Sequence, residues 1–185
     1  MRYPTLSLAE LSLVAAFAAA LTTVTASAQA TDAAYVIQAD RTIAGLRFGP
    51  ATPTDVAARF GRPATSRADA SGGCRQSWPG LGLTVLYLDL YAPHPCTTGR
   101  LAGATVTNRA RWRTSVGLRV GDSTARARAL YPHATRHTGY QPWDGLWLVT
   151  RHVCKEVGGS AYPALLARMR GGRVSALVVN PGVCE

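Results

Sequence analysis

Two stretches of the chain share one pattern: GLRFGPATPTDVAARFGRP at residues 45–63 and GLRVGDSTARARALYPHA at residues 117–134. Each begins with Gly-Leu-Arg, an apolar residue and a second glycine, and each continues with apolar residues at helical spacing. Thr52 followed by Pro53 is typical of a helix start, because Thr caps the first turn and proline there loses no hydrogen bond. Ser123, next to Asp122, holds the same place in the second stretch. The pattern predicts two equivalent capped helices.

Runs with the alternation of β-strands follow each predicted helix. Residues 74–78, 81–91 and 99–115 follow the first helix, and residues 145–153, 162–170 and 173–180 follow the second. Gly171-Gly172 between the last two runs is typical of a hairpin turn. We therefore expect an α+β fold of two similar units side by side, at residues 31–114 and 115–185. Each unit is expected to be a short helix followed by a three-stranded antiparallel meander.

The first 30 residues have the layout of a secretory signal peptide. Arg2 precedes an apolar run at residues 11–21, and both Ala26-Ser27-Ala28 and Ala28-Gln29-Ala30 fit an A-x-A cleavage sequence. The apolar run is shorter than the roughly 20 residues that span a membrane. We expect cleavage after Ala30, a secreted or extracytoplasmic location in the cell envelope or periplasm, and no membrane attachment afterwards.

Four cysteines in an exported chain favour two disulfides. Cys74 begins one predicted strand and Cys96 follows the next, so antiparallel pairing brings them to the same end of the meander. Cys154 and Cys184 follow the first and third strands of the second unit, whose ends also coincide. We expect the bridges Cys74–Cys96 and Cys154–Cys184. The chain has no C-x-x-C pair, which disfavours zinc, and we expect neither a metal nor a cofactor.

The chain is strongly basic, with 20 Lys and Arg against 10 Asp and Glu and a net charge of +10. Lys155 is the only lysine. This charge fits an acidic protein partner or an anionic cell-surface polymer, and it fits a solvated arginine-rich surface equally well. We do not expect nucleic acid as a partner.

Gly121-Asp122-Ser123 resembles the nucleophile block of GDS-type esterases, whose serine works with a histidine from an Asp-x-x-His sequence. No histidine of the chain has Asp three residues before it. The matching place in the first stretch contains Thr52, a cap. We expect Ser123 to cap a helix and expect no catalytic residue, with a small extracytoplasmic serine hydrolase as the alternative.

The glycine-cap-helix segments at residues 49–60 and 121–131, each followed by a meander, resemble the tandem repeats of the β-lactamase-inhibitor-protein type. They are also similar to the small outer-membrane-assembly lipoproteins, although this chain has no cysteine for lipid attachment at the expected cleavage site. The resemblance implies two units whose sheets form one concave face for a protein partner. It does not imply that the partner is a β-lactamase.

Strand alternation indicates which side chains share the face opposite the one that the helices cover. Tyr, Trp and Arg dominate protein interfaces, and the face is rich in them. It is expected to contain Tyr87, Tyr91, Arg109, Arg111, Arg113, Trp147, Arg151, Arg168 and Arg170. We therefore expect a non-catalytic binding module, inhibitory or otherwise, that uses this sheet face for a protein partner. Attachment to polyanions through the arginines is a further alternative, and an ordinary solvated sheet face explains the same pattern about equally well.

Overall fold

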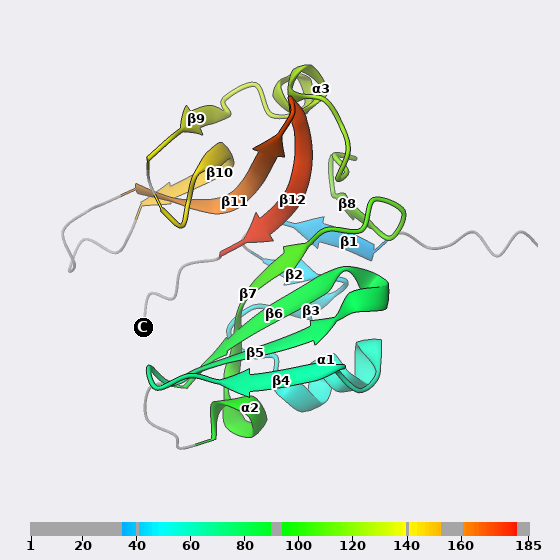
Figure 1. The fold of residues 1–185 in the computed structure, drawn as a ribbon, viewed down its shortest axis with the longest axis vertical. Helices are drawn as coiled ribbons and strands as arrows, with labels where there is room; N and C mark the ends of the chain where they lie inside the picture. The colour runs from blue at the N-terminus through cyan, green and yellow to red at the C-terminus, as the bar shows by residue number, and fades with distance from the viewer. Residues whose placement is uncertain (1–34, 40, 90–93, 140, 153–160, 181–185) are drawn as a thin grey trace, which may run out of the picture. The chain divides into compact units, whose positions relative to one another are not determined.

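The computed structural model describes residues 35–39, 41–89, 94–139, 141–152 and 161–180. Within these ranges the strands form a four-stranded and an eight-stranded sheet (Figure 1). The smaller sheet has the order β3-β2-β1-β8. Its strands are β3 (Leu46–Arg47), β2 (Thr42–Ile43), β1 (Tyr35–Gln38) and β8 (Trp112–Thr114). The predicted signal peptide lies outside the described residues.

The larger sheet has the order β4-β5-β6-β7-β12-β11-β10-β9, and every neighbouring pair is antiparallel. Two meanders of four strands meet at the β7–β12 pair, where Leu177 lies opposite Val106. The first meander contains β4 (Thr65–Ala68), β5 (Gly73–Trp78), β6 (Leu83–Leu88) and β7 (Arg100–Val106). The second contains β9 (Thr135–His137), β10 (Gly145–His152), β11 (Ala161–Arg170) and β12 (Arg173–Val179).

The predicted fold of two helix-plus-three-stranded units is wrong. Each meander has four strands, the two meanders share one continuous sheet, and a second sheet is present. One cause lies in residues 99–115, which form two strands rather than one. The Asn108 side chain accepts a hydrogen bond from the Ala110 backbone N–H (2.9 Å), and this Asx turn separates β7 from β8. β8 then pairs in parallel with β1, in the smaller sheet.

The two predicted helix caps are confirmed. Helix α1 (Pro53–Phe60) begins at Thr52, whose hydroxyl accepts the Asp55 N–H (3.3 Å) while the Asp55 carboxylate accepts the Thr52 N–H (2.8 Å). That backbone hydrogen bond, followed by the one from the Thr52 hydroxyl, lowers the pKa of Asp55. Helix α3 (Thr124–Leu130) begins at Ser123, whose hydroxyl accepts the Arg126 N–H (3.1 Å). The shorter α2 (Pro95–Thr98) and the 3-10 turn η1 (Pro79–Leu81) complete the described helices.

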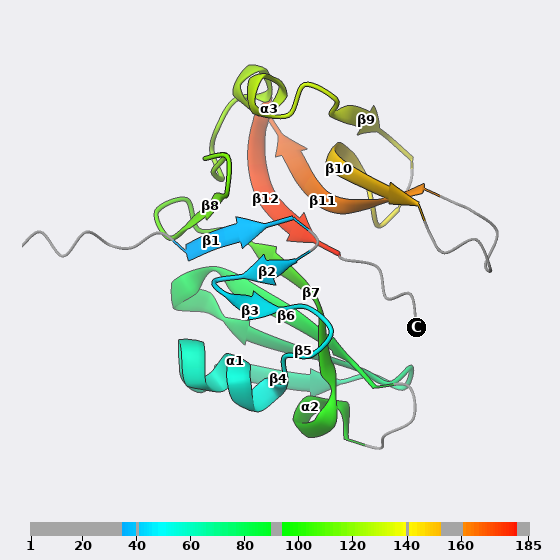
Figure 2. The ribbon, with the colours of Figure 1, turned by 180° about the vertical axis from the view of Figure 1, so that it is seen from behind.

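The main core lies on one side of the eight-stranded sheet, where β1, β2 and β3 cover it (Figure 2). The Trp78 indole N–H donates to the Gly61 carbonyl at the end of α1 (2.9 Å), and the Trp112 indole N–H donates to the Leu81 carbonyl (2.7 Å). Both meanders and the smaller sheet supply fully buried side chains to this core, among them Ile37, Ile43, Leu83, Leu101, Trp112, Leu165 and Leu177.

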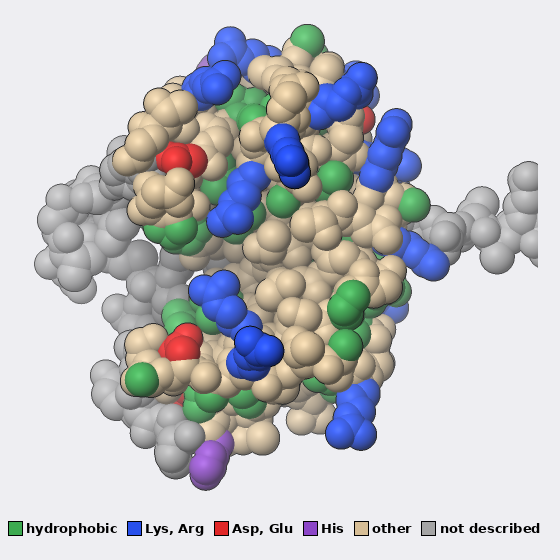
Figure 3. Space-filling model, viewed as in Figure 1, with side chains coloured by type: hydrophobic (Ala, Val, Ile, Leu, Met, Phe, Trp, Pro, Cys, Tyr) green, Lys and Arg blue, Asp and Glu red, His purple; other side chains and the backbone are tan. Residues whose placement is uncertain are grey.

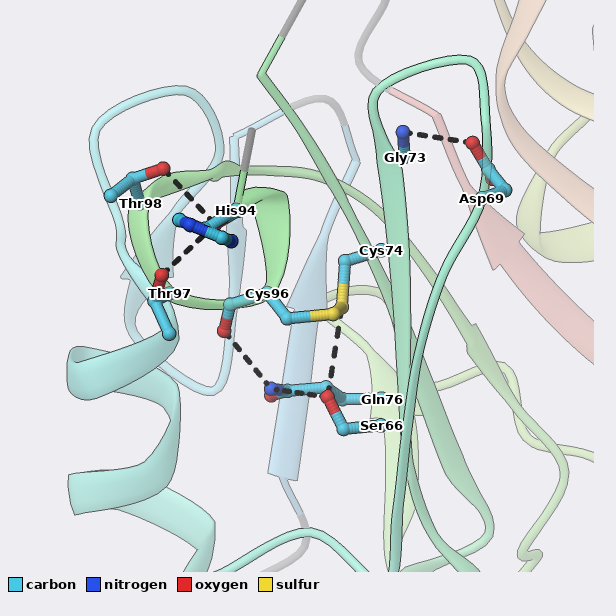
Figure 4. The surroundings of a disulfide bond; sticks show 9 residues. All are labelled: Ser66, Asp69, Gly73, Cys74, Gln76, His94, Cys96, Thr97 and Thr98. Atoms are coloured by element: carbon cyan, nitrogen blue, oxygen red, sulfur yellow. Dashed lines mark hydrogen bonds between the residues drawn. A yellow bond between two sulfur atoms is a disulfide. The ribbon is translucent and has the colours of Figure 1, made fainter. Parts of the chain in front are cut away.

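The predicted Cys74–Cys96 disulfide is confirmed, with the two Cα atoms 5.1 Å apart. It joins β5 to α2 (Figure 4). The Gln76 side-chain amide lies beside the bridge and donates to the Ser66 hydroxyl (3.3 Å) and the Cys96 carbonyl (3.4 Å). Cys154 and Cys184, the other predicted pair, lie outside the described residues.

Candidate binding surface

The eight-stranded sheet has a second side, which we call the outer face, opposite the smaller sheet. Strand β6 shows the division: Leu83, Val85 and Tyr87 are buried in the main core, whereas the alternate residues Thr84 and Leu86 are half-buried on the outer face. Cys74 lies opposite Tyr87 in the strand register, and its disulfide to α2 lies on the core side. The disulfide therefore explains which side of β6 faces inward.

The strand register places one row of side chains across the outer face. Ser77 lies opposite Thr84, Thr84 opposite Thr105, and Thr105 opposite Val178. The row continues through Leu166 on β11 to Trp147 on β10. Its first half is hydroxylic. Its second half is the apolar Trp147 cluster, which consists of Trp147, Leu166 and Val178, all of them buried.

Residues 141–144, which precede β10, are held beside the Trp147 cluster. The Trp147 indole N–H donates to the Trp143 carbonyl (2.9 Å), and Trp143 itself packs against the cluster. The His137 ring stacks on the Trp147 ring, with the two centroids 3.7 Å apart. The Gln141 side-chain amide donates to the Asp144 carboxylate (2.8 Å). These contacts hold residues 141–144 in place, and these residues form a wall on the outer face.

Two hollows lie on either side of this wall. The sheet hollow, of about 170 Å³, is lined by Arg75, Leu86, Gly103, Trp143, Arg168 and Val178. The loop hollow, of about 480 Å³, is lined by Arg136, His137, Asp144, Arg168, Arg170 and Ser175. Pro142 and Arg168 line both hollows. The two hollows are therefore neighbouring parts of one surface, and Arg168 stands between them.

Positive charge dominates this surface. Arg75, Arg136, Arg168 and Arg170 are exposed, and among the described residues the lining of the two hollows contains one acid, Asp144. The space-filling view shows several clusters of arginine side chains on this face and few acidic ones (Figure 3). The Arg168 guanidinium donates a long hydrogen bond to the Pro142 carbonyl (3.5 Å). This arrangement suits an anionic group, because guanidinium binds carboxylates in a planar, two-pronged geometry.

The structure brings together part of the predicted binding set. Trp147, Arg168 and Arg170 lie on the outer face, the last two lining the hollows, and Arg151 is exposed on β10. Arg109, Arg111 and Arg113 do not join them: the first two precede β8 in the loop after β7, and Arg113 lies on β8, in the smaller sheet. Tyr91 lies outside the described residues.

Tyr87 belongs to the core and not to the predicted face. Its side chain is fully buried, and its hydroxyl has no hydrogen-bond partner within the described part of the chain. Burial raises the pKa of the Tyr87 phenol well above its ordinary value. The phenol is therefore neutral at physiological pH and packs as an apolar group.

Sequence reasoning missed Arg75, Arg136 and Trp143. A signal for Arg75 exists, because Cys74, Gln76 and Trp78 alternate with it in β5 and are buried. With the cysteine assigned to the core side, Arg75 follows on the outer face. Arg136 and Trp143 lie on and after the three-residue strand β9, which is too short to show alternation.

Ser123 and His137, two side chains that could take part in catalysis, have structural roles in the described part of the chain. Ser123 Oγ accepts the Arg126 N–H as a helix cap. The His137 ring nitrogen lies 3.0 Å from the Thr135 hydroxyl, and the ring stacks on Trp147. Among the described residues, no group of three His, Cys, Asp or Glu side chains is placed to hold a metal ion.

No protein-family model, curated protein or solved structure matches this chain. None of the helices in the described ranges combines the length and the apolar character needed to cross a lipid bilayer.

Proposed function

We propose that the chain is a secreted, disulfide-stabilised, non-catalytic module that binds a protein partner through the outer face of its eight-stranded sheet. The observation that carries the proposal is the pair of hollows around Arg168, with arginines on the rim and Trp143 against the Trp147 cluster. Arginine and tryptophan are enriched at the positions that contribute most to protein binding. The Cys74–Cys96 disulfide supports an oxidising, extracytoplasmic compartment.

Photo-crosslinking tests this proposal. A benzophenone amino acid replaces Ser175, which is exposed and lines the loop hollow, in the chain as it is produced by its own cells. The matched control carries the same group at Ala129, an exposed position of α3 that lines neither hollow. We expect ultraviolet light to produce a defined protein adduct from position 175 and none from position 129, identified by mass spectrometry.

A second variant relates the adduct to the arginines. Arg168→Ala, combined with the photoreactive group at position 175, is expected to reduce the adduct strongly, because Arg168 lines both hollows. Equal adducts from positions 175 and 129 would contradict the proposal. An adduct consisting of anionic polysaccharide alone would favour the polyanion alternative and reject a protein partner.

A further inference from the structure

The residues that line the two hollows indicate which kind of ligand these hollows would bind. Arg75 on β5 and Arg168 on β11 are four strand positions apart, about 19 Å across a flat sheet at the usual strand spacing. Both nevertheless line the sheet hollow, one at each side of its floor. The floor between them includes Leu86, which is half-buried, and Val178 of the Trp147 cluster. The hydroxyl-bearing Thr84 and Thr105 also line this hollow, so its floor is apolar only in part and lies between two cations.

Gly103 leaves space at the centre of this floor. A Cβ atom at this position would stand 3.2 Å from the Val179 carbonyl oxygen and 3.8 Å from Leu86 Cβ. Without it, the floor between Leu86 and Val178 stays open to an incoming side chain. An aliphatic side chain placed there would contact Val178 and bury apolar surface of the half-buried Leu86, which is favourable in proportion to the area removed from water.

The loop hollow differs in its chemistry. Three arginines, Arg136, Arg168 and Arg170, line it together with the exposed Ser175. Asp144 is the acid of its lining, and this carboxylate accepts a hydrogen bond from Gln141. With three cations against one anion among the described residues of its lining, the hollow favours an anionic group.

We propose that the two hollows together bind an extended acidic peptide segment of the partner, with an aliphatic side chain in the sheet hollow and carboxylates at Arg168 and its neighbours. This inference rests on the proposed function and specifies its ligand. A segment that contains both acidic and aliphatic residues matches a surface with arginines around a partly apolar floor. A sulfated or phosphorylated polymer matches the rim alone, since it has no apolar group to place over Leu86 and Val178.

The test is a fluorescence-anisotropy titration of the purified mature protein with three fluorescein-labelled heptapeptides. The first alternates glutamate and leucine, the second glutamine and leucine, and the third glutamate and serine. We expect the glutamate–leucine peptide to bind at least about tenfold more tightly than either of the others, because each control removes one of the two interactions.

Variants at exposed positions locate the binding. Arg168→Gln is expected to weaken binding of the glutamate–leucine peptide by about tenfold or more, and Arg75→Gln by a smaller factor. Arg126→Gln on α3 removes the same charge outside the hollows and is expected to leave the affinity unchanged. Thermal melting of each variant verifies that it is folded.

Two results would overturn the inference. One is equal loss of affinity in Arg126→Gln and Arg168→Gln, which indicates attraction by net charge alone. The other is equal affinity for the glutamate–leucine and glutamate–serine peptides together with displacement by heparin fragments, which indicates a polyanion site. The two experiments separate this inference from the proposed function. A protein adduct from position 175 without binding of the glutamate–leucine peptide would support the protein-binding module and reject the acidic segment as its ligand.

Discussion

The two helix caps are equivalent in position but differ in the groups that support them. At α1, Thr52 and Asp55 exchange hydrogen bonds, so two backbone donors of the first turn are satisfied. At α3, Ser123 accepts the Arg126 N–H, and the neighbouring Asp122 carboxylate accepts the Arg119 N–H instead (2.8 Å). Asp122 is therefore already engaged and is not placed to replace a lost Ser123 hydroxyl.

Ser123→Ala should consequently lower stability without affecting any activity. Loss of such a cap costs about 0.5–2 kcal/mol. For a domain of this size that corresponds to a decrease in Tm of about 2–6 °C. Thr52→Ala should behave in the same way, and thermal melts of both variants measure the effect. Ester turnover by the wild type that disappears in Ser123→Ala and persists in Thr52→Ala would instead support the serine hydrolase.

At the scale of residues, strand alternation predicts correctly that Val85 and Tyr87 share one side of β6. It does not predict which side faces the core, because Leu86 and Leu88 make the other side equally apolar. The disulfide determines which side faces the core, because it joins Cys74 to α2 and Cys74 lies opposite Tyr87. Pattern alone therefore assigned Tyr87 to the outer face and missed Arg75.

At the scale of elements, the disulfide attaches the short helix α2 to β5. A four-residue helix has little stability of its own. The Cys74–Cys96 bridge closes a sequence separation of 22 residues. Loop-closure entropy assigns about 3 kcal/mol to a loop of this length.

The double variant Cys74→Ala/Cys96→Ala should therefore lose about 3 kcal/mol of stability and about 6–12 °C in Tm. Differential scanning calorimetry under non-reducing conditions measures the loss. The double variant is preferable to added reductant, since reductant also acts on Cys154 and Cys184. An unchanged Tm would show that the bridge contributes nothing to stability in solution. Non-reducing peptide mapping separately tests the predicted Cys154–Cys184 bridge.

The elements that sequence analysis identified are those with strong local signals. Caps, a Gly-Gly turn and long alternating runs revealed α1, α3 and the hairpin of β11 and β12. The strands of the smaller sheet contain two to four residues each, too few for an alternating pattern. The parallel pairing of β1 with β8 depends on residues far apart in the sequence, such as Tyr35 opposite Trp112. No local pattern contains that information.

At the scale of the whole molecule, the residues described in the structure share one main core. Leu83 and Leu101 from the first meander pack in the same cluster as Leu165 and Leu177 from the second. We therefore expect residues 31–114 and 115–185 to unfold together in one transition, although sequence analysis divides them into two repeat units.

Urea titrations followed through two tryptophan variants test this expectation. Trp143→Phe/Trp147→Phe retains Trp78 and Trp112, which report on the first part, and Trp78→Phe/Trp112→Phe retains the other two. In each variant the fluorescence midpoint should coincide with the midpoint from far-ultraviolet circular dichroism. Separate midpoints would establish two independently folding units.

The position of β12 in the sheet has a consequence for the timing of folding. It is the last described strand in the sequence, yet it lies in the middle of the eight-stranded sheet, between β7 and β11. Until it has been synthesised and inserted, β7 and β11 both expose unpaired edges, which are sites for pairing with other chains. Contacts between β7 and β12, which are far apart in the sequence, are also slow to form. A nascent chain is therefore most exposed to misassembly just before β12 is synthesised, and a chaperone that delays folding until then would protect these two edges.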